Sequence, residues 1–134
     1  MKAQSAVAES DIAFDACFTE AYALPSALRS KWVEVVNCAG QPVLFTIDDD
    51  GYVNCTLRQK NAKTGWAAPF RIPYVDTFGN PLVPPDVKTL RALSVTAVDD
   101  GRAFLVLCTE TLVFIAASGD PSCAEDTWSG VVQT

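Results

Sequence analysis

The stretch GQPVLFTIDDDGYVNCTL, residues 40–57, contains the features that decide the fold. Residues 43–47 form a continuous apolar run of the length typical of a buried strand, and residues 52–57 alternate apolar and polar side chains. Between these runs lies Asp48-Asp49-Asp50-Gly51, whose Asp-Gly pair suits the tight turns of β-hairpins. The stretch therefore predicts two antiparallel strands joined by a short turn.

The sequence on either side of this hairpin predicts two more strands. Residues 32–36 are rich in β-branched and aromatic side chains, which favour a strand, and residues 37–41 contain a glycine suited to a turn. After the hairpin, a polar turn at residues 59–65 leads to Trp66 and a short strand near residues 70–72. Residues 31–73 are thus predicted to form one four-stranded antiparallel unit.

The same pattern returns after a proline-rich connection. Proline there prevents regular ladder pairing and stiffens the chain. A second unit is predicted over residues 92–134, with strands at 93–98, 103–108 and 112–116, Trp128 in a loop, and a last strand from 131. Gly40 aligns with Gly101, and Trp66 aligns with Trp128 after small gaps. The repeat is about 61 residues long, and internal repeats of this kind mark arrays of supersecondary units. The predicted fold class is therefore all-β with two four-stranded units.

This repeat resembles the four-stranded blades of β-propellers, in particular lectin-like ones whose units end in a Gly-Trp step. Gly65-Trp66 has that step, whereas Trp128 follows Thr127. Propellers have about four to eight blades, so the resemblance implies a homo-oligomer, for example a trimer, or a part of a larger assembly. The alternative is a β-sandwich with two similar hairpins.

Residues 1–30 form a separate N-terminal segment. Residues 12–18 alternate in the manner of a strand, although Ser10 is also suited to cap a helix over the same stretch. We favour a strand, swapped into or closing the incomplete last unit, because an open sheet edge invites aggregation. The segment lacks the continuous apolar core of a signal peptide, and the chain lacks the roughly 18–20 apolar residues of a membrane span. These features favour a cytoplasmic location but leave it open.

Charge and residue usage exclude several classes of function. The net charge of −6 disfavours nucleic acids and anionic membranes as partners. The chain has no histidine, which removes Ser-His-Asp and Cys-His catalysis and histidine-ligated metals. Its five cysteines contain no C-x-x-C pair, so we expect free, partly buried thiols, with one disulfide as the alternative. No metal, cofactor or catalytic residue is predicted.

The candidate ligand-binding residues are two tryptophans and their polar neighbours. Trp66 and Trp128 have aromatic faces suited to the apolar face of a sugar ring, and Asn61, Lys63 and Asp126 are placed to bind hydroxyl groups. The alternative, which we favour, is that both tryptophans anchor the core, as large aromatic residues commonly do. Calcium binding by the acidic turn is disfavoured, because the spacing of an EF-hand loop is absent.

Three functional hypotheses follow. The first is a non-catalytic module that binds a glycan or a protein partner. The second is a structural subunit whose open edges other chains fill. The third is a fragment of a glycoside-acting enzyme that works with a pair of carboxylates. The carboxylates available for that third hypothesis are Glu34, Asp76, Asp86, Glu110, Glu125 and Asp126.

Overall fold

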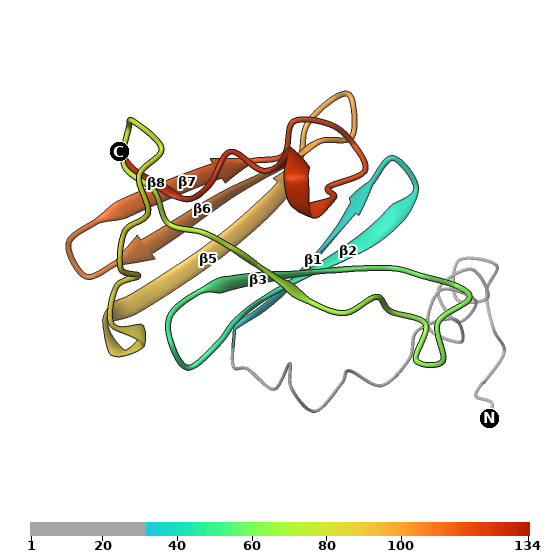
Figure 1. Cartoon of the computed structure of the whole chain (residues 1–134), viewed down its shortest axis with the longest axis horizontal. Helices are drawn as coiled ribbons and strands as arrows, with labels where there is room; N and C mark the ends of the chain where they lie inside the picture. The colour runs from blue at the N-terminus through green and yellow to red at the C-terminus, as the bar shows by residue number, and fades with distance from the viewer. Residues whose placement is uncertain (1–31) are drawn as a thin grey trace, which may run out of the picture.

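The computed structural model describes residues 32–134, which form two four-stranded antiparallel sheets stacked as two layers (Figure 1). Sheet 1 contains, in spatial order, β1 (Val33–Cys38), β2 (Gln41–Ile47), β3 (Val53–Leu57) and β4 (Phe70–Ile72). Sheet 2 contains β5 (Leu90–Ala97), β6 (Ala103–Thr109), β7 (Val113–Ala117) and β8 (Val132–Gln133). The predicted all-β fold with two four-stranded units is confirmed.

Within residues 32–134 the helical elements are two short 3-10 turns, η2 (Val87–Thr89) and η3 (Glu125–Thr127). None of the helices in this part of the chain is long and apolar enough to cross a membrane. The predicted strand at residues 12–18, and with it Cys17, lies outside the described residues.

The β2–β3 turn shows how local sequence makes a hairpin. The Asp48 carboxylate accepts hydrogen bonds from the backbone N–H groups of Asp50 and Tyr52, at 3.0 and 3.1 Å. Gly51 donates its N–H to the Asp48 carbonyl and has a φ of +91°, a left-handed conformation that glycine adopts at little cost. A Cβ at Gly51 would also lie 2.5 Å from the carbonyl oxygen of Pro85, so the proline-rich connection packs directly onto this turn.

The two sheets repeat the same strand register. Phe45 lies opposite Cys55 in sheet 1, and Val106 lies opposite Ile115 at the same place in sheet 2. We call two positions equivalent when they share such a place in the two sheets. The equivalent pairs include Val33 and Leu93, Val35 and Val95, Val43 and Phe104, Leu44 and Leu105, Phe45 and Val106, and Val53 and Val113.

The hydrophobic core lies between the sheets and is built from one face of each. Residues paired across antiparallel strands point to the same side of a sheet. We call the side of sheet 1 that carries Phe45, and the side of sheet 2 that carries its equivalent Val106, the front of each sheet, and the other side its back. The front of sheet 1 faces sheet 2 with Val43, Phe45, Ile47, Val53, Cys55, Phe70 and Ile72. The back of sheet 2 faces sheet 1 with Leu93, Val95, Ala103, Leu105, Leu107, Phe114 and Ala116. Burial of each large apolar side chain contributes about 1.5–3 kcal/mol.

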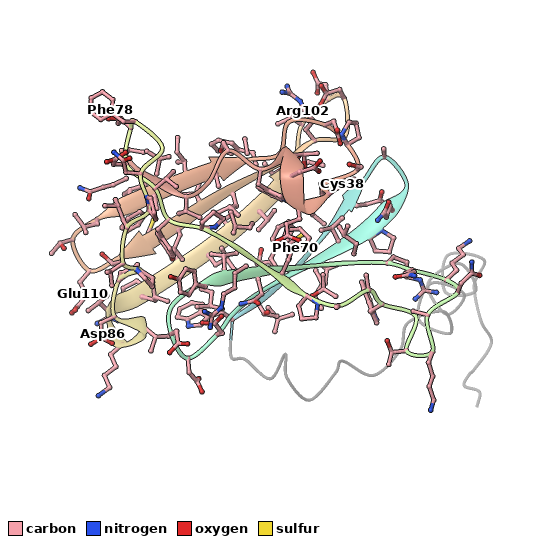
Figure 2. All side chains as sticks on the ribbon, viewed as in Figure 1. Cys38, Phe70, Phe78, Asp86, Arg102 and Glu110 are labelled. Carbon is pink, nitrogen blue, oxygen red and sulfur yellow. The ribbon has the colours of Figure 1, made fainter. Side chains whose placement is uncertain are left out.

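The two sheets pack front to back. Leu105 lies in the core, yet its equivalent Leu44 points to the other side of sheet 1 and belongs to a separate cluster with Trp66. The front of sheet 1 therefore packs against the back of sheet 2, and β1 lies next to β5 (Figure 1). Phe70, on the edge strand β4 of sheet 1, also lies between the two layers (Figure 2).

The segment that joins the sheets is fastened to both of them. Tyr74 is buried, donates its hydroxyl to the Gly51 carbonyl at 2.8 Å, and packs edge-on against Phe114 with ring centroids 5.5 Å apart. The backbone of Val75 donates to Val131, and Val131 donates to Pro73, at 3.0 and 2.8 Å. The connection thus runs beside the start of β8 and fixes sheet 2 relative to sheet 1.

Candidate binding surfaces

Trp128 lies at the core between the two sheets. Its ring meets Phe45 edge-on, with centroids 5.6 Å apart and an interplanar angle of 80°. Its indole Nε1 donates to the Cys123 carbonyl at 3.0 Å. Its neighbour Asp126 is exposed on η3. Because the ring edge and the N–H are both engaged within the protein, the tryptophan joins sheet 2 to the front of sheet 1.

Trp66 occupies the opposite side of sheet 1. It pairs with Arg58 beyond the end of β3, and the guanidinium carbon of Arg58 lies 5.8 Å from the centre of the indole ring. The ring is 9% exposed and packs with Leu44. Asn61 and Lys63 are exposed on the preceding loop. The structure therefore separates Trp66 from Trp128 by the thickness of a sheet, and Asn61 and Lys63 lie on the loop that leads to Trp66.

The loop before Trp66 is held by its own backbone. Gln59 donates to the Gly65 carbonyl at 2.9 Å, and Gly65 donates to Ala62 at 3.0 Å. The Thr64 hydroxyl bonds with the backbone of Trp66. Asn61 and Lys63 thus lie on an ordered turn, and their side chains are exposed to solvent.

Each acidic turn is paired with one arginine, which offsets part of its negative charge. Arg71 donates to Asp50 at 2.8 Å and to Asp48 at 2.9 Å, and the bond to Asp50 above all raises the pKa of the Arg71 guanidinium. In the second turn Arg102 pairs with Asp100 at 2.8 Å, and hydrogen bonds from Arg102 lower the pKa of Asp100. No group of three potential metal ligands is found among residues 32–134.

The other carboxylates serve local structure where their contacts are known. Asp76 accepts hydrogen bonds from Asn80 and from the backbone N–H of Phe78, which lowers its pKa and closes the loop at residues 76–80. Asp86 caps η2, and Glu110 pairs with Arg91 at 2.8 Å. Asp86 and Glu110 flank the η2 end of sheet 2, and Phe78 points outward from the tip of the connection (Figure 2).

The four described cysteines are free thiols, as predicted. Cys38, Cys55 and Cys123 are buried in the core, whereas Cys108 is half-buried. Burial, then the hydrogen bond to Cys123 and the charge of that neighbour, raise the pKa of Cys38 to about 12. Thiols in this state are poor nucleophiles, because the thiolate is the reactive form.

The face of sheet 2 that points away from sheet 1 is apolar across three strands. We call it the open face, and it consists of Phe104, Val106 and Cys108 on β6, Val113, Ile115 and Ala117 on β7, and Val132 on β8. Six of these residues are half-buried, and Val113 is 41% exposed. The β5 part of the same side is exposed and more polar, with Ala92, Ser94 and Thr96. Contiguous exposed apolar patches mark interaction sites.

The back of sheet 1 has apolar residues of its own. On β1, Val33 and Val35 are 41% and 63% exposed. Beside them Leu44 and Trp66 bury each other. Two polar atoms at this side, the Thr56 hydroxyl and Trp66 Nε1, are buried without a hydrogen-bond partner among the described residues. The open face of sheet 2 thus differs from the polar outer surface expected of a two-sheet sandwich, whereas the back of sheet 1 also carries Thr46, Asn54 and Arg71.

Sequence reasoning did not identify the open face as a site. A signal for it is present in residues 103–108, AFLVLC, which are apolar at successive positions. Successive side chains of a strand point to opposite faces, so a continuous apolar run places apolar groups on both sides of the sheet. The back-facing half of this run fills the core, and the other half forms the open face.

Comparison with known proteins supplies no relative: no protein-family model, curated protein or solved structure matches the chain.

Proposed function

We propose that this chain is a non-catalytic binding module that recognises a protein partner through the open face of sheet 2. The observation that carries the proposal is the block of seven apolar residues on β6, β7 and β8, described above, that points away from the core. Apolar side chains at the centre of a patch, with a more polar rim, are typical of protein interfaces. The rim here is formed by the polar side of β5 and by the Arg102–Asp100 ion pair.

We further propose that the two sheets are propeller-blade-like units. Three features support this interpretation: the up-and-down order of each sheet, the front-to-back packing, and the crossing of the chain from the outermost strand β4 to β5, which lies next to β1. In a sandwich the outer faces are polar. In a propeller both faces of a blade pack against neighbouring blades. A blade whose neighbour lies in another chain therefore has an apolar face that its own chain does not cover.

A protein partner is better supported than a glycan. Sugar stacking needs an accessible aromatic face, and Trp66 is 9% exposed, while the ring of Trp128 packs on Phe45. A glycan is the second candidate, favoured by the exposure of Asn61 and Lys63 on the ordered loop before Trp66. The third hypothesis, an enzyme acting through carboxylates, has least support because Asp76 and Glu110 are engaged in local contacts.

Site-specific photo-crosslinking tests the proposal. Benzoylphenylalanine replaces Ile115 on the open face or, as the control, Val83, which is 90% exposed on the connection. In an extract of the cells that make the protein, we expect protein adducts from position 115 well above those from position 83. Adding Val106→Glu removes them, because an unpaired charge in an apolar interface is strongly unfavourable. Equal adduct yields at the two positions would overturn the proposal.

A glycan array separates the second candidate. The labelled chain is applied beside a variant with Asn61→Ala and Lys63→Ala. Binding to defined sugars that this variant loses and Val106→Glu retains would favour a glycan module. We expect no such binding.

A further inference from the structure

We propose that the back of sheet 1 is a docking surface for the chain's own residues 12–24, which lie outside the described residues. The surface covers β2 and β3 on the side that points away from sheet 2. The inference concerns a different surface from the open face and does not depend on the proposed function.

The backs of the two sheets are buried to the same degree. Each residue on the back of β2 and β3 can be compared with its equivalent on β6 and β7, which packs against sheet 1. The pairs, with their exposed fractions, are Leu44 and Leu105 (2% and 0%), Thr46 and Leu107 (2% and 0%), Asn54 and Phe114 (9% and 7%), and Thr56 and Ala116 (0% and 2%).

The back of sheet 2 is buried because the front of sheet 1 lies across it (Figure 1). Among residues 32–134 no strand lies across the back of sheet 1, since sheet 2 is on its other side. Trp66 and Arg58 cover only the part near the end of β3. Because the burial exists within a single chain, residues 1–31 are left to supply the rest of the cover.

The exposed and the unpaired groups define where the cover lies. Val33 and Val35 on β1 are exposed, so the cover lies over β2 and β3 and leaves the β1 edge open. The Thr56 hydroxyl and Trp66 Nε1 are buried without a hydrogen-bond partner among the described residues. An indole N–H can only donate, so the covering segment must bring an acceptor as well as apolar side chains.

Residues 12–24 have the composition that this surface requires. They are apolar at most positions, and Phe14 and Phe18 fall on the same side of the segment both in a strand and in a helix. Their charged residues are Asp15 and Glu20, which are acceptors and have the opposite charge to Arg58 at the back of sheet 1.

The segment of the same chain is long enough to reach this surface. Strand β1 begins at Val33 on the edge of sheet 1, and β3 lies two strand spacings away, about 10 Å. Residues 25–31 span up to roughly 23–25 Å when extended. A second copy is therefore not needed to supply the cover.

The cover makes sheet 1 a terminal unit. Stacked units need a cap at the end of the stack, because the last unit otherwise exposes its packing side. Residues 12–24 form that cap, and the open face of sheet 2 stays uncovered. Where the proposed function holds, the module therefore binds one partner and does not form a continuous stack.

Photo-crosslinking in the full chain tests the inference. Benzoylphenylalanine replaces Phe18 or, as the matched control, Ala6, which precedes residues 12–24. Mass spectrometry of the digested chain locates the adducts. We expect position 18 to join, within one chain, to Leu44 or Trp66 at the back of sheet 1, with yields well above those from position 6.

Hydroxyl-radical oxidation of Trp66, measured relative to Phe78, gives a second readout. Phe18→Asp places a charge in the proposed contact, and Ala6→Asp adds the same charge outside it. We expect Trp66 oxidation to rise several-fold in Phe18→Asp and to stay at the wild-type level in Ala6→Asp. Urea unfolding checks that both variants are folded. Should Phe18→Asp fail to fold, the crosslinks from position 18 decide alone.

Other outcomes overturn the inference. Adducts from position 18 on β8 or the open face show that the segment completes sheet 2 instead. Adducts that join two chains assign the cover to a second copy. Unchanged Trp66 oxidation in a folded Phe18→Asp variant shows that the segment does not cover this side. The proposed function is judged separately, by the adducts at position 115 in the cell extract, and either proposal can fail without the other.

Discussion

The front of sheet 1 and the open face of sheet 2 are the same surface in two settings. Both are built from equivalent positions on the second and third strands of their sheets, and both are apolar. Val53 on the front of sheet 1 is 0% exposed, while its equivalent Val113 is 41% exposed. The difference comes from the neighbour: sheet 2 covers the front of sheet 1, and nothing among the described residues covers the open face to the same degree.

The apolar side chains make either face able to pack against another surface. Whether the face becomes core or binding surface depends on whether a second sheet of the same chain covers it. Burial of apolar area is favourable wherever the covering surface comes from. A repeated unit that packs front to back always has one uncovered front, unless the chain of units closes. Substitutions at equivalent positions should therefore have unequal effects in the two sheets.

The largest expected effect is at the covered front. Phe45→Ala removes a fully buried ring and its edge-on contact with Trp128, 5.6 Å away. We expect the free energy of unfolding to fall by about 3–5 kcal/mol. Urea denaturation followed by tryptophan fluorescence measures it. Val106→Ala, at the equivalent position, should change the stability of the separated chain by less than about 1 kcal/mol; similar losses at both positions would contradict the contrast.

The turns before β2 and β6 should differ in the opposite direction, with the larger loss of stability in sheet 2. Gly40 and Gly101 have φ values of +84° and +89°. A Cβ at Gly40 would meet no atom within 4 Å, whereas one at Gly101 would lie 2.9 Å from the Cβ of Ala39. Gly40→Ala should cost about 1–2 kcal/mol from the left-handed backbone alone.

Gly101→Ala should cost about 1–3 kcal/mol more than Gly40→Ala, because the turns of the two sheets touch at this point. Thermal and urea unfolding of both variants give the difference. Equal losses would mean that the approach of Ala39 to Gly101 relaxes without cost.

Val53 and Val113 are identical residues at equivalent positions, so they test most cleanly how much a covering sheet contributes to stability. Val53→Ala should lower the free energy of unfolding by about 2 kcal/mol, from two lost methyl groups and the small cavity that remains. Val113→Ala should stay within about 0.5 kcal/mol when measured at a concentration where the chain is monomeric. A Val113 loss as large as that of Val53 would show that the open face is covered within a single chain.

The covered interface also sets an alkaline limit on stability. Burial raises the pKa of Cys38 from 9.0 to about 12, and burial likewise raises the pKa of Tyr74. Below about pH 8 both groups are protonated in the folded and the unfolded chain, so they leave stability unchanged. Above pH 9 the unfolded Cys38 loses its proton while the folded one keeps it.

The free energy of unfolding therefore falls above pH 9, by about 1.4 kcal/mol per pH unit for one such thiol. Urea midpoints between pH 8 and pH 10.5 measure the slope. Cys38→Ala, folded and compared over the same range, should show a slope smaller by that amount. An unchanged slope would mean that the buried Cys38 is not the group that titrates.

Much of the fold could be predicted because its signals are local. The apolar run before Asp48 and the Asp-Gly pair at residues 50–51 define the β2–β3 hairpin, and the structure has strands on both sides of that turn. Strand β5 was expected to begin later than Leu90. It starts there because Leu90 pairs with Thr109, with an irregularity before Ala92, and such pairing depends on distant sequence.

The site could be predicted only in part, since alternation does not tell which face of a sheet has a neighbour. The roles of Trp66 and Trp128 as ligand or core residues depend on packing, and the structure buries Trp66 and places Trp128 against Phe45. The open face needs the sheet order and the packing direction before it can be distinguished from core. The apolar run at residues 103–108 gives only the number of apolar side chains, not their surroundings.

Hydroxyl-radical footprinting of two phenylalanines tests most directly whether the open face is a protein-binding surface. Phe104 lies on the open face, and Phe78, 89% exposed at the tip of the connection, reports the same chemistry on a free surface. We expect oxidation of Phe104, relative to Phe78, to fall as the purified chain is concentrated or returned to its cell extract, and Val106→Glu to abolish this protection. Oxidation of Phe104 that stays constant relative to Phe78 under both conditions would contradict the proposal that a protein covers this face.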